Sequence, residues 1–260
     1  MIPLKSILKD KTILIMGVAN KWSIAWGIAE SCFEAGANII FSYQGERNRQ
    51  ALEKLTSNMR SVHLYKCDVT SDEEIIDLFG QIKENFGIIN GIVHSIAFAK
   101  REELEGAYYN TSRQGYHLAQ DISVYSLVAV ANHARKVLTD GGSIVTLTYF
   151  GGEKAVPNYN VMGVAKSALE SSVRYLAADL GVDAIRVNSI SAGPIKTLAA
   201  QGVKGFNDIL HIYEDKVPLK RTVTQREVGD TAVFLLSRMS RGITGENIHV
   251  DAGYHAIGLL

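Results

Sequence analysis

Apolar and polar residues along the chain fall into two alternating patterns. Short apolar runs, most of them ended by glycine or a polar residue, predict buried strands, and the stretches between them repeat apolar residues at helical spacing. The strands are expected at residues 12–16, 38–43, 62–67, 88–93, 143–148, 185–190 and 247–250. Strands that alternate with helices in this way are typical of an α/β protein with a parallel sheet.

Helices are expected between these strands, and two of them begin with capping residues. Ser23 is a candidate N-cap, and Ser71 with Glu74 resembles a capping box. The helices are expected at residues 23–35, in a charged stretch that ends near 55, and at 71–85, 116–138, 159–180 and 228–236. Residues 196–218 hold only short amphipathic pieces, and we expect them to form a substrate lid because long irregular connections usually serve a binding site.

The pattern continues without a repeat, a linker or a change of composition, and 260 residues suit one large α/β unit. We therefore predict a single domain, residues 1–260, with a doubly wound, Rossmann-type fold: a mainly parallel seven-stranded sheet with helices on both faces. In such sheets ligands bind beyond the carboxyl ends of the strands. The residues that follow the strand ends, and that one crevice is expected to collect, are Gly17, Gln44, Asp68, Ser95, Tyr149 and Ile195.

Charge and composition narrow the classes of function. With 27 basic and 27 acidic residues and no long run of either sign, the chain lacks the basic surface that nucleic-acid binding requires. No apolar stretch approaches the roughly 18 residues that span a bilayer, and the N-terminus does not resemble a signal peptide. Cys32 and Cys67 are isolated, so we expect buried thiols rather than a disulfide or a metal site. We expect a cytoplasmic protein without a bound metal.

Tyr159 and Lys166 stand seven residues apart at the start of an expected helix. This spacing puts both side chains on nearly the same face, about 10 Å apart along the axis, which leaves room for a small polar group between them. A phenol near an ammonium is a candidate acid or oxyanion donor, and the positive charge is expected to favour the ionised phenol. The spacing alone is weak evidence, since chance supplies on the order of one such pair. A second pair, Tyr213 and Lys220, is interrupted by Pro218, which excludes one straight helix.

The ends of the first two expected strands suggest a nucleotide site. Gly17 opens a strand–turn–helix unit whose free N–H groups favour an anion, although a G-x-G-x-x-G motif is absent. In dinucleotide-binding folds the end of the second strand meets the adenosine ribose, with an acid for NAD or an arginine for NADP. Gln44 is neutral there, and Arg47 and Arg49 are either cofactor contacts or solvated helix residues. His94 has no metal-ligand spacing to another histidine and is expected to be structural.

Several motifs together resemble one known family. They are residues 17–25 (GVANKWSIA), 94–97 (HSIA), 147–149 (LTY), 157–166 (PNYNVMGVAK), 188–195 (NSISAGPI) and 250–253 (VDAG). From about residue 8 to residue 258 the chain resembles the short-chain dehydrogenase/reductases, and among them the divergent branch of bacterial enoyl-(acyl carrier protein) reductases. Tyr149 stands where the ketone reductases of the family use serine.

The resemblance implies reduction of trans-2-enoyl thioesters on acyl carrier protein, in fatty-acid elongation, by hydride from a nicotinamide. It implies three catalytic residues: Tyr159 hydrogen-bonds the thioester oxygen, Lys166 holds the nicotinamide ribose and Tyr149 helps to orient the thioester. The cofactor would contact Gly17, Ala19, Ser23, Ile24, Gln44, Asp68, Val69, Ser95, Ile96, Ala97, Lys166, Ile195 and Thr197. The substrate would contact Ala97, Phe98, Tyr149, Tyr159, Met162, Ala199 and Phe206, where each apolar contact is equally compatible with core packing.

Gln44 resembles family members that use NADH, so we expect NADH, with NADPH as the alternative. Two other functions stay open at this point: a 3-oxoacyl or other carbonyl reductase of the same fold, and a non-catalytic nucleotide-binding sensor. The apolar stretches 126–138 and 162–180 suggest a subunit interface, and the resemblance implies a homotetramer.

Overall fold

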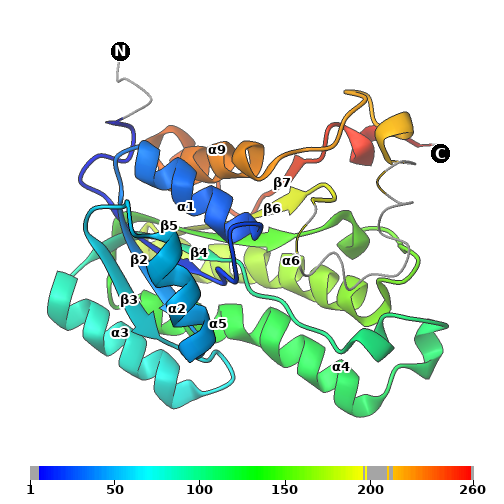
Figure 1. Cartoon of the computed structure of the whole chain (residues 1–260), viewed down its shortest axis with the longest axis horizontal. Coiled ribbons are helices and arrows are strands. Elements are labelled where there is room, and N and C mark those ends of the chain that lie inside the picture. Colours follow the sequence, from blue (N-terminus) through cyan, green and yellow to red (C-terminus); the bar gives the residue numbers. More distant parts are fainter. Residues whose placement is uncertain (1–5, 196, 198–209, 211–212, 259–260) are drawn as a thin grey trace.

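The computed structural model describes the chain except for residues 1–5, 196, 198–209, 211–212 and 259–260. Its centre is a seven-stranded sheet in the order β3-β2-β1-β4-β5-β6-β7, with all neighbouring strands parallel (Figure 1). The strands are β1 (Thr12–Met16), β2 (Asn38–Tyr43), β3 (Val62–Lys66), β4 (Ile89–His94), β5 (Leu138–Thr148), β6 (Arg186–Ala192) and β7 (Asn247–Val250). The strand order reverses between β1 and β4, as in a doubly wound sheet. The predicted fold class is therefore confirmed.

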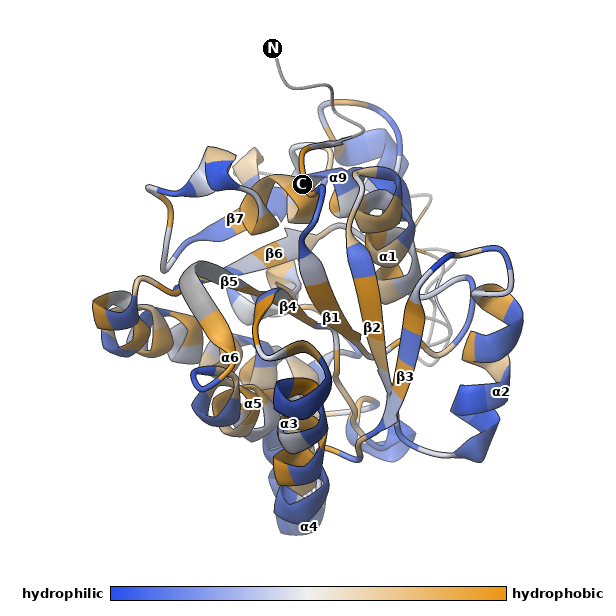
Figure 2. Cartoon of the chain, turned by 90° about the vertical axis from the view of Figure 1, so that its left-hand side faces the viewer, coloured by the Kyte–Doolittle hydropathy of each residue, from blue (hydrophilic) through white to orange (hydrophobic). Residues whose placement is uncertain are grey.

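Helices cover both faces of the sheet (Figure 2). On one face lie α1 (Ile24–Glu34) and α9 (Gln225–Leu236), with α2 (Glu46–Leu55) beside them, and on the other lie α3 (Asp72–Phe86), α4 (Arg113–Gln120), α5 (Ser126–Ala134) and α6 (Asn160–Leu180). Ile13 and Ile15 pack toward the first layer and Leu14 toward the second, because side chains alternate across a strand. Residues 13–16 of β1 are buried on both faces and are all apolar for this reason.

The largest difference from the predicted elements lies between residues 113 and 138. The prediction of a single helix over residues 116–138 is wrong. α4 ends at Gln120, a π-helical turn covers Asp121–Tyr125, and α5 ends at Ala134. β5 begins five residues before the predicted start, because Leu138 pairs with Ile89 on β4 and is buried there. Periodicity alone does not distinguish a buried helix end from the start of a buried strand.

The capping prediction was half right. Ser71 accepts a hydrogen bond from the backbone N–H of Glu74, as an N-cap does. The Glu74 carboxylate does not return to the Ser71 backbone; it accepts from the Asp68 N–H at 2.7 Å and from Lys66. A complete capping box instead joins Thr224 and Glu227, so α9 begins three residues before the predicted start.

Most of the expected lid, residues 196–218, lies outside the described residues. Its described end forms a helical turn at 213–216. Tyr213 and Val217 pack there with Val223 and Ala252 in a small apolar cluster, next to the last strand. The helical turn ends before Pro218, so Tyr213 and Lys220 do not share a helix. Among the described residues no helix is long and apolar enough to cross a membrane.

Candidate active site

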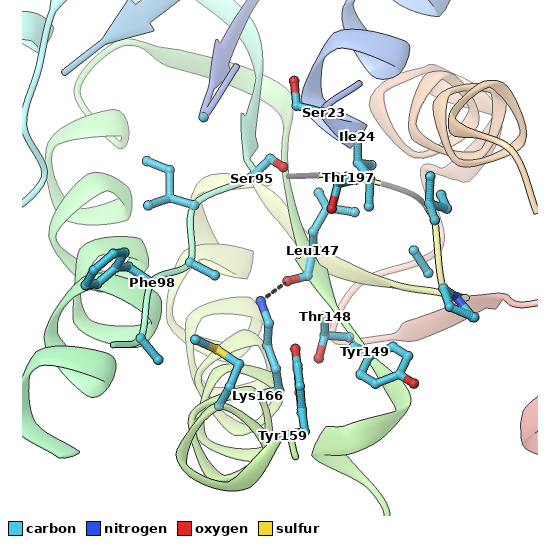
Figure 3. Close-up of a pocket in the computed structure, with 18 of the residues that line it drawn as sticks. Ser23, Ile24, Ser95, Phe98, Leu147, Thr148, Tyr149, Tyr159, Lys166 and Thr197 are labelled. Carbon is cyan, nitrogen blue, oxygen red and sulfur yellow. Dashed lines mark hydrogen bonds between the residues drawn. The ribbon is translucent and has the colours of Figure 1, made fainter. Parts of the chain in front are cut away.

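Two adjoining cavities open at the carboxyl ends of the strands, with volumes of about 520 and 370 Å³. Both are lined by Gly17, Ala19 and residues 95–98, so they form one continuous crevice. The larger cavity also contains Ser23, Ile24, Tyr149, Tyr159, Met162, Lys166, Ile195 and Thr197 (Figure 3). The smaller one also contains Gln44, Asp68 and Val69. Every predicted site residue that the structure describes therefore lines this crevice, whereas Ala199 and Phe206 lie outside the described residues.

The turn after β1 accepts only glycine. Gly17 has a φ of +93°, and a Cβ at this position would lie 2.0 Å from the carbonyl oxygen of Ser95. Both the left-handed backbone and the close approach of the next chain segment exclude a larger residue. The turn is thus held tightly against the end of β4.

The first turn of α1 has open backbone N–H groups. Ser23 occupies the N-cap position with extended backbone, as predicted, but its side chain makes no capping hydrogen bond. Its hydroxyl donates instead to the carbonyl of Asn20 at 2.5 Å. A helix start without a side-chain cap, at the edge of a cavity, favours an anionic ligand.

Tyr159 is the residue directly before α6, and its ring is fixed by close packing. It makes an edge-to-face contact with Tyr149, with the ring centres 5.0 Å apart. Gly151 makes room for the ring, since a Cβ there would lie 2.5 Å from it. Burial, followed by Tyr149 and Glu170, raises the pKa of Tyr159 well above its usual value. The expectation that Lys166 would favour the ionised phenol is therefore wrong, and Tyr159 is a protonated hydrogen-bond donor at neutral pH.

Lys166 is buried, with 6% of its surface exposed, and points from α6 toward the end of β5. Its Nζ donates to the carbonyl oxygen of Leu147 at 2.7 Å (Figure 3). Burial lowers the pKa of Lys166 to about 8, and the charge of Glu170 opposes this effect. The ammonium is thus largely protonated at neutral pH, with donors left for a ligand in the cavity.

Tyr149 and Met162 line the same cavity from the end of β5 and from α6. Burial, and then Tyr254, raises the pKa of Tyr149 to about 12, so this phenol is also protonated. Together with Phe98 they give this part of the crevice an apolar wall with two hydroxyl groups, from Tyr149 and Tyr159.

The smaller cavity is polar and carries a negative charge. Gln44 Nε2 donates to Asp68 Oδ2 at 2.8 Å, and both side chains follow strand ends. Burial alone would raise the pKa of Asp68, but hydrogen bonds from Gln44 and Thr70 outweigh it and lower the pKa. Arg49 is held by Glu46 at 3.6 Å and Glu53 at 3.0 Å, as expected for a solvated helix residue.

His94 is fully buried below the crevice. Its Nδ1 lies 3.2 Å from Thr146 Oγ1 and its Nε2 lies 2.8 Å from Ser126 Oγ. Burial, with a contribution from Lys166, lowers its pKa to about 3. A neutral, doubly hydrogen-bonded histidine is structural, as predicted. Cys32 and Cys67 are likewise buried free thiols.

Sequence reasoning missed several residues that line the crevice. Thr148 and Val156 line the larger cavity, and Asn48 and Ile122 line the smaller one. Thr148 lies in the 147–149 motif and is the last residue of β5, directly before Tyr149, so the sequence held a signal for it. Ile122 belongs to the π-helical turn, which the apolar pattern of this stretch does not reveal. Among the described residues, no three or more His, Cys, Asp or Glu are grouped to hold a metal ion.

Comparisons with known proteins agree with this arrangement. The family model for Enoyl-(Acyl carrier protein) reductase matches residues 17–255. The NADH form of this reductase from Bacillus subtilis (strain 168) is 60% identical over 95% of this chain and 97% of its own length. The NADPH form from Staphylococcus aureus (strain MRSA252) is 59% identical over 96% and 98%.

Solved structures give the same result. A crystal structure of the Bacillus cereus enoyl-acyl carrier protein reductase with NADP+ and indole naphthyridinone superposes with a TM-score of 0.96 at 57% identity, covering 98% of this chain and all of that one. The NADH-type reductase of Aquifex aeolicus VF5 gives 0.95 at 47% identity, covering 98% and 100%. The chain therefore belongs to the enoyl-(acyl carrier protein) reductase family.

Proposed function

We propose that the chain reduces trans-2-enoyl thioesters carried on acyl carrier protein, with a nicotinamide cofactor, in fatty-acid elongation. One observation carries the proposal. The protonated phenol of Tyr159 and the buried ammonium of Lys166, both at the start of α6, line the same crevice as the turn at Gly17, which admits only glycine. Membership of the reductase family supports the reaction class.

The residues present fit a dinucleotide. The close approach at Gly17 and the uncapped start of α1 suit a pyrophosphate, which needs backbone N–H groups and no intervening side chain. In this proposal Ser23 and Ile24 contact the pyrophosphate, Asp68 and Val69 the adenine end, and Lys166 the nicotinamide ribose. Ile195, Thr197 and the rim at residues 95–97 flank the nicotinamide.

When bound, the cofactor supplies the hydride that adds to the β-carbon of the enoyl group. Negative charge then develops on the thioester oxygen, and the Tyr159 hydroxyl donates a hydrogen bond to it. A donor of this kind stabilises the transition state more than the ground state. Lys166 provides a fixed positive charge nearby, and Tyr149 orients the thioester. Phe98 and Met162, with Ala199 and Phe206 of the lid segment, contact the acyl chain.

NADH is the proposed preferred cofactor. The Asp68 carboxylate, held by Gln44, places negative charge in the adenosine cavity, which disfavours the additional phosphate of NADPH. Arg49 is already paired with Glu46 and Glu53. Relatives that use NADH and relatives that use NADPH are similar to this chain at nearly the same identity. The proposed preference for NADH therefore rests on these local charges.

We also propose a cytoplasmic homotetramer that takes its substrate from acyl carrier protein. Three large apolar side chains on this side of the molecule are exposed: Tyr125, just before α5, by 52%, Val128 on α5 by 36% and Tyr175 on α6 by 74%. A second copy of the chain would cover them. Light scattering at micromolar concentration should give four times the mass of one chain. A monomeric mass would contradict this assembly.

A spectrophotometric assay with two substrates tests the reaction. NADH should be oxidised by crotonyl-(acyl carrier protein) but not by the acetoacetyl form, because Tyr149 replaces the serine expected in a ketone reductase. The reverse selectivity would establish a carbonyl reductase, and cofactor binding without turnover of either substrate would establish a nucleotide sensor.

A further inference from the structure

Glu170 is a buried carboxylate one helical turn beyond Lys166 on α6, with 8% of its surface exposed. In the part of the chain that the structure describes, no Lys, Arg or His lies within ion-pair distance of it. Thr148 Oγ1 donates to Glu170 Oε1 at 2.6 Å. A glutamate is seldom buried with so little compensation, because removing its charge from water is costly.

The surroundings of Glu170 are built to hold its carboxyl group in place. A Cβ at Gly152 would lie 2.6 Å from Glu170 Oε1, so only glycine leaves room for the carboxylate. Thr148, its hydrogen-bond donor, ends β5 and also lines the cofactor cavity. The carboxylate is therefore fixed between the helix that carries Lys166 and the strand whose Leu147 carbonyl accepts the Lys166 hydrogen bond.

Lys166 needs a counter-charge. It is buried, and its described hydrogen bond goes to the neutral carbonyl of Leu147. Burial disfavours the charged form of a lysine. Because residues four apart lie on the same face of a helix, Glu170 is the carboxylate nearest to Lys166 in sequence on that face.

We propose that Glu170 is a positioning residue that keeps Lys166 protonated and thereby maintains the ribose contact of the cofactor. The inference rests on the proposed function, since it assigns to Lys166 the cofactor role given above. Glu170 itself touches neither cofactor nor substrate in this proposal. It acts through the charge of Lys166.

The titration of the two groups agrees with this geometry. Glu170 opposes the effect of burial on the pKa of Lys166, and in turn Lys166 lowers the pKa of Glu170. Burial is the largest influence on Glu170 and raises its pKa, which the Thr148 hydrogen bond opposes. Glu170 also raises the pKa of Tyr159, so it favours the protonated phenol that the reaction needs.

A chain of polar and charged side chains on and near β7 lies close to Glu170. Glu153 raises the pKa of Glu170, and His249 of β7 lowers it. His249 Nε2 lies 2.6 Å from Glu153 Oε1, and Asn247 Nδ2 donates to the same oxygen at 3.1 Å. The His249 ring stacks on His255 at 3.9 Å, and His255 Nδ1 lies 3.0 Å from Asp251 Oδ2. Because Glu153 and His249 also act on Glu170, the proposal is tested by a pH series around the Lys166 pKa of about 8, since Lys166 is the group whose charge the variant is expected to change.

The decisive variant is Glu170→Gln, which keeps the shape and still accepts the Thr148 hydrogen bond but removes the charge. The dissociation constant of NADH is measured by fluorescence titration between about pH 6 and pH 9. Loss of an opposite charge shifts a pKa by about one unit or more, so the alkaline weakening of NADH binding should begin about one pH unit lower than in the parent. At about pH 8 we expect roughly tenfold weaker binding relative to the acidic plateau, against about twofold in the parent. Asp179→Asn, an exposed carboxylate on the same helix, is the matched control.

A purely structural role for Glu170 predicts a different result. In that case Glu170→Gln would change NADH affinity by the same factor at every pH and leave the position of the alkaline limb unchanged, which would overturn the inference. If Glu170→Gln does not fold, Glu170→Asp decides: a shift of a fraction of a unit in the same direction supports the counter-charge, and an unchanged limb overturns it. Failure of the parent chain to bind either NADH or NADPH at any pH would refute the proposed function itself, and the inference with it.

Discussion

The Nζ atom of Lys166 donates a 2.7 Å hydrogen bond to the carbonyl oxygen of Leu147, one residue before the end of β5. The bond ties the start of α6 to the strand that carries Tyr149 at its end. It also holds the ammonium at the wall of the cavity that the Tyr159 ring lines from the residue before the same helix. The proposed catalytic groups therefore come from one helix and one strand end, and the charge of Lys166 depends on how deeply it is buried.

Catalysis should fall at alkaline pH as Lys166 loses its proton. Lysine is charged below its pKa, which burial lowers to about 8, so kcat/KM should be constant toward neutral pH and decline above about pH 8. The measurement is kcat/KM for the enoyl substrate across this range. Lys166→Met, which removes the ammonium, should lose most of the activity, and its remaining kcat/KM should no longer decline at alkaline pH. A parent profile that stays flat to about pH 10 would show that the Lys166 charge is not used.

Tyr159→Phe should lower kcat by about 10²–10³, the usual effect of removing one donor to a developing oxyanion. The ring is retained and packs against Tyr149 as before, so NADH affinity and the unfolding midpoint should change little. Tyr109→Phe, at a residue that is 88% exposed, is the control and should keep full activity per chain. Near-normal turnover by Tyr159→Phe would exclude the phenol as the donor.

Gly17→Ala should destabilise the fold and abolish cofactor binding. Two effects add here: a positive φ, which costs about 1–3 kcal/mol for a non-glycine residue, and a Cβ 2.0 Å from the Ser95 carbonyl oxygen. Gly87→Ala separates them, because Gly87 also has a positive φ of 67° but no atom within 4 Å of the added Cβ. Chemical denaturation should show a distinctly larger loss in the free energy of unfolding for Gly17→Ala than for Gly87→Ala. Equal losses would mean that the close approach has no energetic weight.

Much of this crevice follows from the sequence, because it depends on local signals. The apolar runs predict where each strand ends, and Gly17 indicates a tight turn after the first of them. The seven-residue spacing predicts that Tyr159 and Lys166 point to the same side. What the sequence does not reveal depends on tertiary contacts. The pKa of Tyr159 is raised first by burial and then by the charges of Tyr149 and Glu170, and none of these can be read from a spacing.

Glu170 and the π-helical turn illustrate the same limit. A glutamate four residues after a lysine ordinarily indicates a solvated pair on a helix surface. Its burial against Gly152 and Thr148 becomes visible only once β5 and α6 are placed together. Likewise, Ser126 donates to the carbonyl of Ile122 and lies 2.8 Å from His94, contacts that accompany the change of helix type at residues 121–125.

His94 should make the protein less stable in acid. Its folded-state pKa is about 3, below the ordinary value of 6.5, so the unfolded chain takes up a proton that the folded chain does not as the pH falls below 6.5. At about pH 5 this contributes a loss of roughly 2 kcal/mol in the free energy of unfolding, from 1.36 kcal/mol for each pKa unit. His94→Gln should be less stable at neutral pH but show a shallower acid dependence in urea denaturation. The same slope in both proteins would contradict the assignment.

Gln44→Arg should shift the cofactor preference toward NADPH. The change removes the neutral partner of Asp68 and adds a cation that suits a phosphate. We expect the ratio of kcat/KM for NADPH to that for NADH to rise on the order of tenfold. Arg49→Gln, which removes a cation already paired with two glutamates, should leave the ratio unchanged. A parent protein that prefers NADPH and loses that preference in Arg49→Gln would reverse the proposed assignment.

The most direct test follows the transferred hydrogen. The protein is incubated with equal amounts of crotonyl- and acetoacetyl-(acyl carrier protein) and with NADH carrying deuterium at both positions of nicotinamide C4, and the products are analysed by mass spectrometry and NMR. We predict a butyryl thioester with one deuterium on its β-carbon, and loss of this product in Tyr159→Phe. Deuterium on a carbinol carbon formed from an acetoacetyl thioester, with no labelled butyryl product, would contradict the assignment of this chain as an enoyl reductase.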